Sequence, residues 1–430
     1  MKQLFLLLRP ADASSATQRL HNDVTGKEVF RVLRKKHGLG FDSFISEKVT
    51  PVFGDISLEN LEIKDSALRK KIRKEVEIVA NFAATRNLDE RYDVALDVNT
   101  MGAKHVFDFA ENCENLEMIL HISTAYIHTG ETPGVILEKP FDISQTINEN
   151  SKILDIDEER RLVRDRLNKL KAAQASKKQE TAAMKELGAE RAILYGWPNT
   201  YAITKAMGEM IMLEKVLIIT FDPFVIYSGR GKFPCLLGNH ESFLDIIPGD
   251  MMVNAVIVAM VNHMKSKSNN RSVSGDDENH NYRYIYHLGS SANREKMNII
   301  KVVKYACEYF CENPLMDKHG NVVEIVKPAF FPTMASFRQH INDNYVLPKK
   351  EGKVSVAKRL VEFYEHYLLF KKIFDDSATE ELRIWMKANG SAEADMFDFD
   401  PQHIDWKECM LNIHIPGLMK YVIEGFNSTN

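Results

Sequence analysis

Cysteine is scarce in this sequence, with five residues scattered over 430 positions: Cys113, Cys235, Cys307, Cys311 and Cys409. So few and so widely separated thiols do not form the disulfide framework of a small secreted domain, and a reducing compartment fits them better. Cys307 and Cys311 can share one face of a helix, but no second pair of ligands accompanies them. We therefore expect buried thiols at these positions and no metal site.

Long apolar runs are also missing. The run Leu4 to Leu8 is shorter than the apolar core of a signal peptide. The most apolar stretch elsewhere, 251–261, contains Asn254 and falls short of the roughly 20 residues that span a bilayer. The sequence therefore predicts neither a signal peptide nor a transmembrane helix, and any contact with a membrane would be peripheral.

An excess of one charge is absent as well, because 56 basic and 60 acidic side chains give a net charge of -4. Bulk electrostatics therefore give no reason to expect a nucleic-acid partner. Charges of both signs are interspersed in the segment 149–191, which favours a solvated helical insertion or lid. The composition, 44% hydrophobic and 27% charged, is that of a globular protein with two or three domains.

The 21 glycines include no G-x-G-x-x-G or G-x-x-G-x-x-G set. Gly229 and Gly231 come nearest, but Pro234 stands where the third glycine would fall. Backbone N–H groups at such a turn cradle the pyrophosphate of a dinucleotide, and no other segment of the sequence obviously replaces them.

What the sequence does contain is a repeated alternation of strands and helices. This pattern predicts a Rossmann-like, doubly wound parallel sheet of the α/β class. It ends around 314–327, so we expect a first domain over 1–318 and a smaller, helix-rich domain over 325–430. The predicted strands are 2–8, 49–56, 76–84, 116–123, 216–221 and 284–289.

Tyr201 and Lys205 are four residues apart in a segment with a helical pattern, so their side chains point to the same side. A nearby ammonium lowers the pKa of a phenol, which makes it a better acid near neutral pH. A hydroxyl from Thr124 or Ser123, at the end of the strand 116–123, would hold a substrate carbonyl against that phenol. Reduction of a carbonyl by hydride needs this set of groups.

Two other tyrosines also have a lysine four residues further on. Pro348 interrupts the helical pattern between Tyr345 and Lys349. Tyr367, which precedes Lys371, belongs to an apolar helical stripe over 360–374 and is expected to be a packing tyrosine. Only Tyr201 follows a strand that ends in hydroxyl residues, so the catalytic interpretation favours Tyr201.

Longer stretches around these residues resemble the plant alcohol-forming fatty acyl-CoA reductases, a branch of the extended short-chain dehydrogenase/reductases. The resemblance runs through nearly all of the chain. Its most specific segments are FISEKVTPVFGDI from Phe44, NFAATRNLDERYDVALDVNTMG from Asn81, HISTAY from His121, YGWPNTYAITKAMGE from Tyr195 and FDFDPQHIDW from Phe397. The resemblance implies NADPH-dependent reduction of a long-chain fatty acyl-CoA to a primary alcohol through an aldehyde. It also implies a location in the cytoplasm or peripherally on the endoplasmic reticulum membrane.

By the same resemblance, Tyr201 is the proton donor, Lys205 the supporting lysine and Thr124 the hydroxyl that binds substrate. Arg9 closes what would be the family's second strand, where a cation pairs with a ribose 2'-phosphate and favours NADPH over NAD. A surface charge that ends a strand is the alternative for Arg9. The remaining cofactor positions implied are Asp55 and Ile56 at the adenine, Ala83 and Ala84 along the cofactor, and the supporting Asn99, besides Tyr201 and Lys205.

The sequence departs from the family in three places. Family members have a strand, a glycine-rich turn and a helix before the segment that corresponds to Lys2, and they are longer after Thr220 and near 349–353. The leading hypothesis is a fatty acyl-CoA reductase. Its rival is a truncated, catalytically silent paralogue or splice product that retains only acyl-chain or partner binding. A related reductase of a sterol or flavonoid ketone is the third interpretation.

Overall fold

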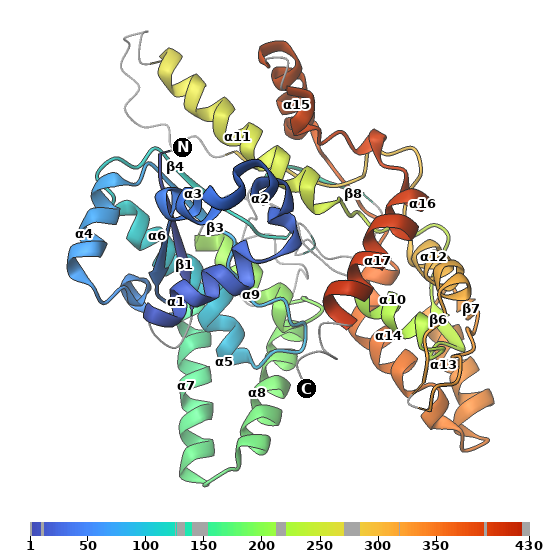
Figure 1. The fold of residues 1–430 in the computed structure, drawn as a ribbon. Helices are drawn as coiled ribbons and strands as arrows, with labels where there is room; N and C mark the ends of the chain where they lie inside the picture. Colours follow the sequence, from blue (N-terminus) through green and yellow to red (C-terminus); the bar gives the residue numbers. More distant parts are fainter. Residues whose placement is uncertain are drawn as a thin grey trace. The chain divides into compact units, whose positions relative to one another are not determined.

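The computed structural model describes residues 2–9, 13–124, 126, 134–139, 154–211, 221–270, 284–317, 319–390 and 394–423 (Figure 1). The chain forms two compact units. Unit 1 comprises Met1–Ile122, Leu154–Gly188 and Ile203–Leu213, and unit 2 comprises Ser123–Ile153, Ala189–Ala202 and Glu214–Asn430. Helix α9 (Thr200–Ile211) runs through the boundary, so that its first turn belongs to unit 2 and the rest to unit 1.

Unit 1 contains two pairs of parallel strands. β1 (Leu4–Leu8) pairs with β2 (Val49–Phe53), and β3 (Ile78–Asn81) pairs with β4 (Met118–His121), with Asn81 opposite His121. Because each pair is parallel, the carboxyl ends of its two strands lie at the same edge. Among the described residues no strand joins one pair to the other.

The helices of unit 1 cover these strands. α4 starts where it does because the Asp65 carboxylate accepts hydrogen bonds from the N–H groups of Ala67 and Leu68. The main core cluster comes from β2, α4, α6 and the loop after β2, and includes Val52, Ile56, Leu61, Ile72, Val106 and Phe109. The helical bounds are α1 (Ala13–Arg19), η1 (Leu20–Thr25), α2 (Arg31–His37), α3 (Phe41–Lys48), α4 (Ser66–Glu75), α5 (Tyr92–Ala95), η5 (Leu96–Met101) and α6 (Gly102–Glu111).

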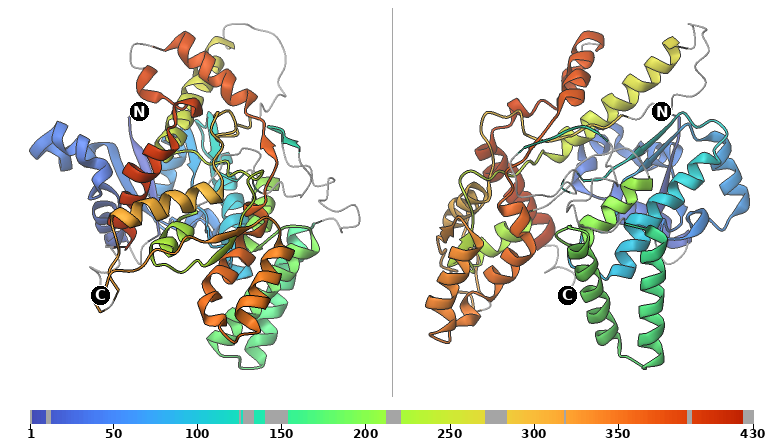
Figure 2. Two further views of the ribbon diagram at one scale, coloured as in Figure 1. Left: turned by 90° about the vertical axis from the view of Figure 1, so that its right-hand side faces the viewer. Right: turned by 180° about the vertical axis from the view of Figure 1, so that it is seen from behind.

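The charged insertion consists of two helices, α7 (Ile156–Ala172) and α8 (Lys177–Leu194), which lie side by side (Figures 1 and 2). Two contacts hold the insertion on α5 and on the residue before it. The Tyr92 hydroxyl donates to the buried Glu159 carboxylate at 2.8 Å, and the Arg91 guanidinium contacts Glu180 at 2.7 Å. Most of its other charged side chains are exposed, and residues 149–153 of the predicted insertion lie outside the described residues.

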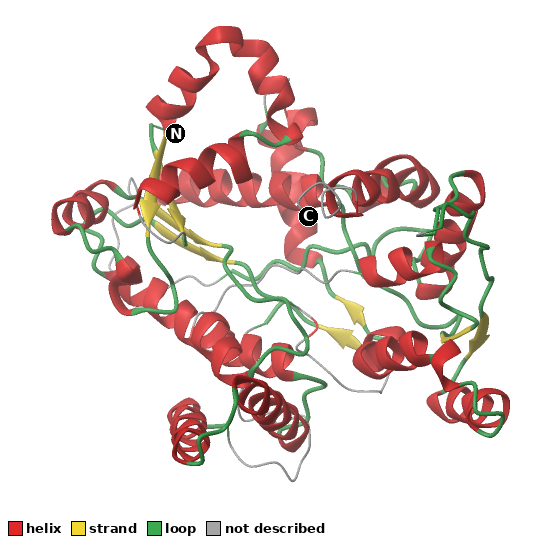
Figure 3. Ribbon diagram, turned by 60° about the horizontal axis from the view of Figure 1, so that its bottom comes forward, coloured by secondary structure: helices red, strands yellow, loops and turns green. Residues whose placement is uncertain are grey.

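Unit 2 is mainly helical, with two short parallel strand pairs (Figure 3). β5 (Val135–Ile136) pairs with β8 (Ile373–Phe374), and β6 (Cys235–Leu237) pairs with β7 (Ala329–Phe331). The helices are α10 (Asp222–Gly229), α11 (Gly249–Asn270), α12 (Ile299–Glu312), α13 (Met334–Ile341), α14 (Ser355–Leu368), α15 (Ser377–Asn389), α16 (Trp406–Glu408) and α17 (Ile415–Leu418). As far as the described residues go, no helix is both apolar and long enough to cross a bilayer.

The predicted strand at 284–289 is wrong, since these residues adopt no strand. Backbone donors in and next to this segment go to side chains instead of to a neighbouring strand. His287 N–H donates to the Glu138 carboxylate at 2.7 Å, and Ser290 N–H donates to the carboxylate of Asp245. The predicted strand at 216–221 lies, apart from Phe221, outside the described residues.

The five cysteines are free thiols. The prediction of a buried thiol is confirmed for Cys307, whose pKa is raised by burial. It is wrong for Cys311, which lies on the exposed side of the last turn of α12.

Candidate active site

Helix α9 carries Tyr201 in its first turn and Lys205 in its second. The Asn199 side chain, just before the helix, accepts a hydrogen bond from Ala202 N–H at 2.9 Å and so caps the helix start. Both functional side chains are buried, with 4% of Tyr201 and 2% of Lys205 exposed. A tyrosine and a lysine one turn apart on a buried helix are the groups needed for proton donation.

Lys205 reaches the end of strand β4. Its ammonium donates a hydrogen bond to the carbonyl of Ile122 at 2.9 Å, across 83 positions of sequence. Burial lowers the pKa of Lys205 to about 8, while the carboxylate of Glu209 opposes that change. The lysine therefore remains mostly protonated at neutral pH.

The hydroxyl candidates follow β4. Thr124 and Ser123 are 1% and 2% exposed. Thr124 Oγ1 accepts from Tyr126 N–H at 3.4 Å, and the Tyr126 hydroxyl is fixed in turn by Asp245, whose N–H donates to it at 2.9 Å. Ser123 Oγ is buried without a hydrogen-bond partner in the described part of the chain. Both hydroxyls thus lie buried just after β4.

His121, at the end of β4, is a polar residue that the sequence analysis did not single out. Asn81 Oδ1 accepts from Ala83 N–H at 3.1 Å, so its amide nitrogen faces His121 Nδ1, also at 3.1 Å. Nδ1 must then accept, which leaves the proton on Nε2. Burial and the Lys205 charge hold the pKa of His121 well below its ordinary value. Nε2–H is therefore a buried donor on a neutral ring, without a partner among the described residues.

Arg9 and Asp55 meet at the carboxyl ends of β1 and β2. Arg9 Nη1 lies 3.6 Å from Asp55 Oδ2, and the arginine side chain is 66% exposed. Such an exposed ion pair is weak, so the guanidinium is available to a stronger anion. Asp55 also accepts hydrogen bonds from the N–H and hydroxyl of Ser57, at 2.9 and 2.8 Å. Ile56, directly after it, is buried, and its carbonyl contacts His105 Nδ1 at 2.9 Å.

Asn99 joins the small-residue loop after β3 to helix α9. Its carbonyl oxygen accepts from Thr85 N–H at 2.9 Å, and its amide nitrogen donates to Thr204 Oγ1 at 3.1 Å. Ala83 is exposed and Ala84 half-buried in this loop, so that their backbone is open to a ligand. Asn99 thus ties the loop after β3 to α9 through these hydrogen bonds.

Known proteins resemble this chain over nearly its whole length. Residues 1–220 match an NAD-binding family model, and residues 345–424 match a second model, both described as male sterility protein. The alcohol-forming fatty acyl-CoA reductase of Simmondsia chinensis is 38% identical over 473 aligned positions, covering 98% of this chain and 92% of that protein. The chain belongs to the fatty acyl-CoA reductases. The probable fatty acyl-CoA reductase 5 of Arabidopsis thaliana is 39% identical, covering 99% of this chain and 92% of that protein.

A solved structure supports the α/β fold class of this fatty acyl-CoA reductase. The terminal R domain of the myxalamid PKS-NRPS pathway has a TM-score of 0.51 at 12% identity, covering 99% of this chain and 85% of that one. The alignment with the Simmondsia reductase spans more positions, 473, than this chain has residues, 430, so that relative carries residues that this chain lacks.

The residues of the NAD-binding segment fit a nicotinamide cofactor at two places, the end of the β3–β4 pair and the end of the β1–β2 pair. Small residues lie open along the loop after β3, and the buried Nε2–H of His121 needs an acceptor. Arg9 provides a cation at the other strand pair. The glycine turn that would cradle a pyrophosphate has no counterpart in the sequence.

Replacing Asn99 with alanine should lower the free energy of unfolding by about 2–3 kcal/mol, because Thr85 N–H and the Thr204 hydroxyl lose a buried partner. It should also raise the KM for NADPH, since the loop 83–85 loses its support. Urea unfolding and initial rates measure the two effects. Asn112→Ala is the matched control, because the Asn112 amide bonds only its own helix at an exposed position. Equal stability of the two variants would contradict the proposed support.

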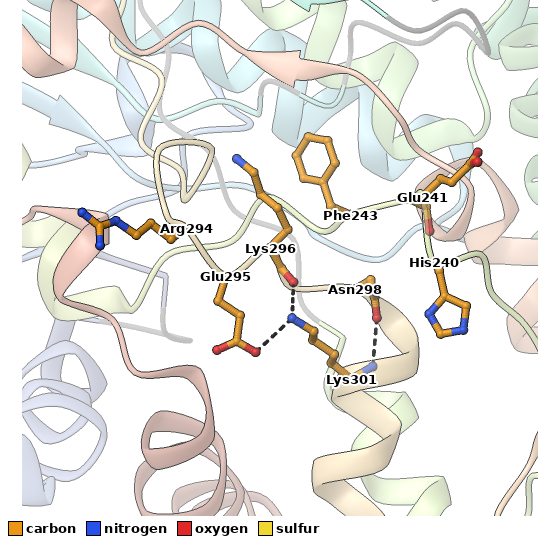
Figure 4. Close-up of a pocket in the computed structure, with 9 residues that line it drawn as sticks. His240, Glu241, Phe243, Arg294, Glu295, Lys296, Asn298 and Lys301 are labelled. Atoms are coloured by element: carbon orange, nitrogen blue, oxygen red, sulfur yellow. Dashed lines mark hydrogen bonds and ion pairs between the residues drawn. The ribbon is translucent and has the colours of Figure 1, made fainter.

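A pocket of about 540 Å³ lies in unit 2, between the loop after β6 and the start of α12 (Figure 4). The Lys301 ammonium in this pocket is already engaged by the Glu295 carboxylate at 2.9 Å and by the Lys296 carbonyl at 2.8 Å. The Arg294 guanidinium points away from Lys301. None of the sequence-predicted site residues line the pocket.

Glu209 is a further buried residue of the site that the catalytic motif did not reveal. The sequence does indicate Glu209, because it stands four residues after Lys205 and the residues between them are small or apolar. His121 had no comparable signal, since its environment depends on Asn81 and Lys205, which are far away in sequence.

Proposed function

We propose that this chain reduces a long-chain fatty acyl-CoA to a primary alcohol with NADPH. The observation that carries the proposal is the buried pair Tyr201 and Lys205 on α9, with Lys205 anchored at the end of β4. Relatives that match nearly the whole chain at 37–39% identity are named fatty acyl-CoA reductases, which disfavours a silent paralogue. Arg9 supports NADPH as the form of the cofactor.

Each residue of the site has a distinct task in this reaction. Thr124 donates its hydroxyl hydrogen to the carbonyl oxygen of the substrate, and Tyr201 delivers a proton to that oxygen as hydride arrives at the carbon. Lys205 lowers the pKa of Tyr201 and orients the ribose of the cofactor. A reduced nicotinamide, when bound, supplies the hydride.

The overall reaction consists of two reductions. The first transfers hydride to the thioester carbon and expels the CoA thiol, which leaves an aldehyde. The second transfers hydride to the aldehyde carbon, and Tyr201 protonates the alkoxide to give the alcohol. Two NADPH are therefore consumed for each thiol released.

The test uses the purified chain with NADPH and a series of long-chain and very-long-chain acyl-CoAs. We expect NADPH consumption, free thiol and fatty alcohol in the ratio of two to one to one. A folded chain that consumes no NADPH with any member of the series would contradict the proposal. Direct titration with NADPH then identifies the silent paralogue, which would not bind it, and turnover of a sterol or flavonoid ketone alone would favour the third interpretation.

We also propose that 1–318 is the reductase domain and 325–430 the C-terminal fatty acyl-CoA reductase domain. We also propose that the protein lies in the cytoplasm or peripherally on the endoplasmic reticulum membrane. Cell fractionation tests the location: protein in the supernatant, or protein released from membranes by salt, agrees with it. Protein that only detergent releases would contradict it.

A further inference from the structure

Glu209 is buried on the same face of α9 as Lys205. It lies one turn further along the helix, and each of the two side chains is 2% exposed. The helix is closely packed here: a Cβ on Gly208, between them, would lie 2.4 Å from the carbonyl oxygen of Asn99. Little room is left for water around either charge.

Among the described residues, two ionisable groups besides Tyr201 are coupled electrostatically to the Lys205 ammonium. His121, on β4, is neutral because burial and the Lys205 charge both disfavour the imidazolium. Glu209, on α9 itself, carries a carboxylate, which raises the pKa of Lys205 against the effect of burial. Charged groups taken out of water are tolerated when an opposite charge is close. A buried glutamate one turn from a buried lysine therefore has a direct electrostatic effect on it.

We propose that Glu209 is a positioning residue, which keeps the Lys205 ammonium charged and held on the Ile122 carbonyl and thereby sets the upper pH limit of the reaction. This inference rests on the roles proposed above for Tyr201 and Lys205. Glu209 acts through Lys205 and does not touch the substrate.

The sign of the pH effect follows from the pKa of Lys205, which lies at about 8 in the folded chain. The ammonium is present below that pH and is lost above it, so the rate should fall as the pH rises through about 8. Without the Glu209 charge, only burial acts on Lys205, and its pKa falls further. The alkaline limb of the rate profile then moves to lower pH, by about one unit or more, which is the usual effect of a close opposite charge.

The experiment compares the pH dependence of kcat for the wild type, Glu209→Gln, Glu209→Asp and Glu159→Gln. Glutamine has the size of glutamate without its charge. In Glu209→Gln the alkaline limb should therefore move to lower pH, while kcat at low pH stays within a few-fold of wild type. Glu209→Asp keeps the charge, so its alkaline limb should return most of the way to the wild-type pH. Glu159→Gln removes another fully buried carboxylate of unit 1, one bound to Tyr92, and should leave the limb in place. A folded Glu209→Gln with an unchanged limb would overturn the proposal.

A second measurement needs no turnover. An unfolded lysine titrates near 10.5 and folded Lys205 near 8, so the unfolded chain binds more protons between these values and stability rises with pH there. In Glu209→Gln this rise should begin below pH 8, and in Lys205→Met it should be absent. An onset that does not move would overturn the proposal, whether or not the chain is active. Loss of turnover in the wild type, with the shifted onset intact, would count against the proposed function alone.

Discussion

Replacing Tyr201 with phenylalanine should lower kcat for acyl-CoA reduction by roughly 10²–10⁴-fold, which is the usual contribution of a positioned general acid. The substitution removes one hydroxyl from a buried ring, so the fold should be kept. Binding of NADPH should change little, because the ammonium of Lys205 and the loop after β3 are untouched. Steady-state rates and a fluorescence titration with NADPH separate the two effects.

Tyr345→Phe is the matched control for this experiment. Tyr345 also has a lysine four residues on, but it lies half-exposed in a helical turn, η7 (Asn342–Val346), with its ring against His340. Its loss should leave kcat unchanged. If Tyr201→Phe turned over acyl-CoA at the wild-type rate, or lost NADPH binding instead of turnover, Tyr201 would have a structural role and not a catalytic one.

Replacing Lys205 with methionine should lower kcat by about 10²-fold or more, because the positive charge that stabilises the developing phenolate is removed. The KM for NADPH should rise as well, by roughly tenfold or more, if the ammonium bonds the ribose, since a hydrogen bond to a charged group contributes about 1.5–3 kcal/mol. Methionine has a similar length and suits a buried site. Initial rates over a range of NADPH concentrations give both constants.

The control for this variant is Lys185→Met. Lys185 is a half-exposed lysine of unit 1 that pairs with Asp89 at 2.8 Å, and no role in the reaction is proposed for it. Equal kinetics for the two variants would refute the role of Lys205. The double variant Lys205→Met with Glu209→Gln should be no slower than Lys205→Met, because Glu209 acts only through the ammonium.

The strands of unit 1 were predictable because their signal is local. Apolar runs that end in small or polar residues predicted β1, β2, β3 and β4, with bounds wider by two to five residues than those observed. The segment 284–289 has the same local pattern and is no strand, since its backbone donors are taken by Glu138 and Asp245. Those two carboxylates lie far from the segment in sequence, so no local pattern reveals them.

The sequence by itself determined the family, the parallel α/β class of the first part of the chain and the pairing of Tyr201 with Lys205. Each of these depends on residue types or on spacing within one helix or strand. Only the tertiary structure decided the protonation states of Lys205 and His121. A pKa depends on burial and on neighbouring groups, and for Lys205 burial has the largest effect. The neutral His121 and the support of Asn99 for α9 likewise exist only once the chain has folded.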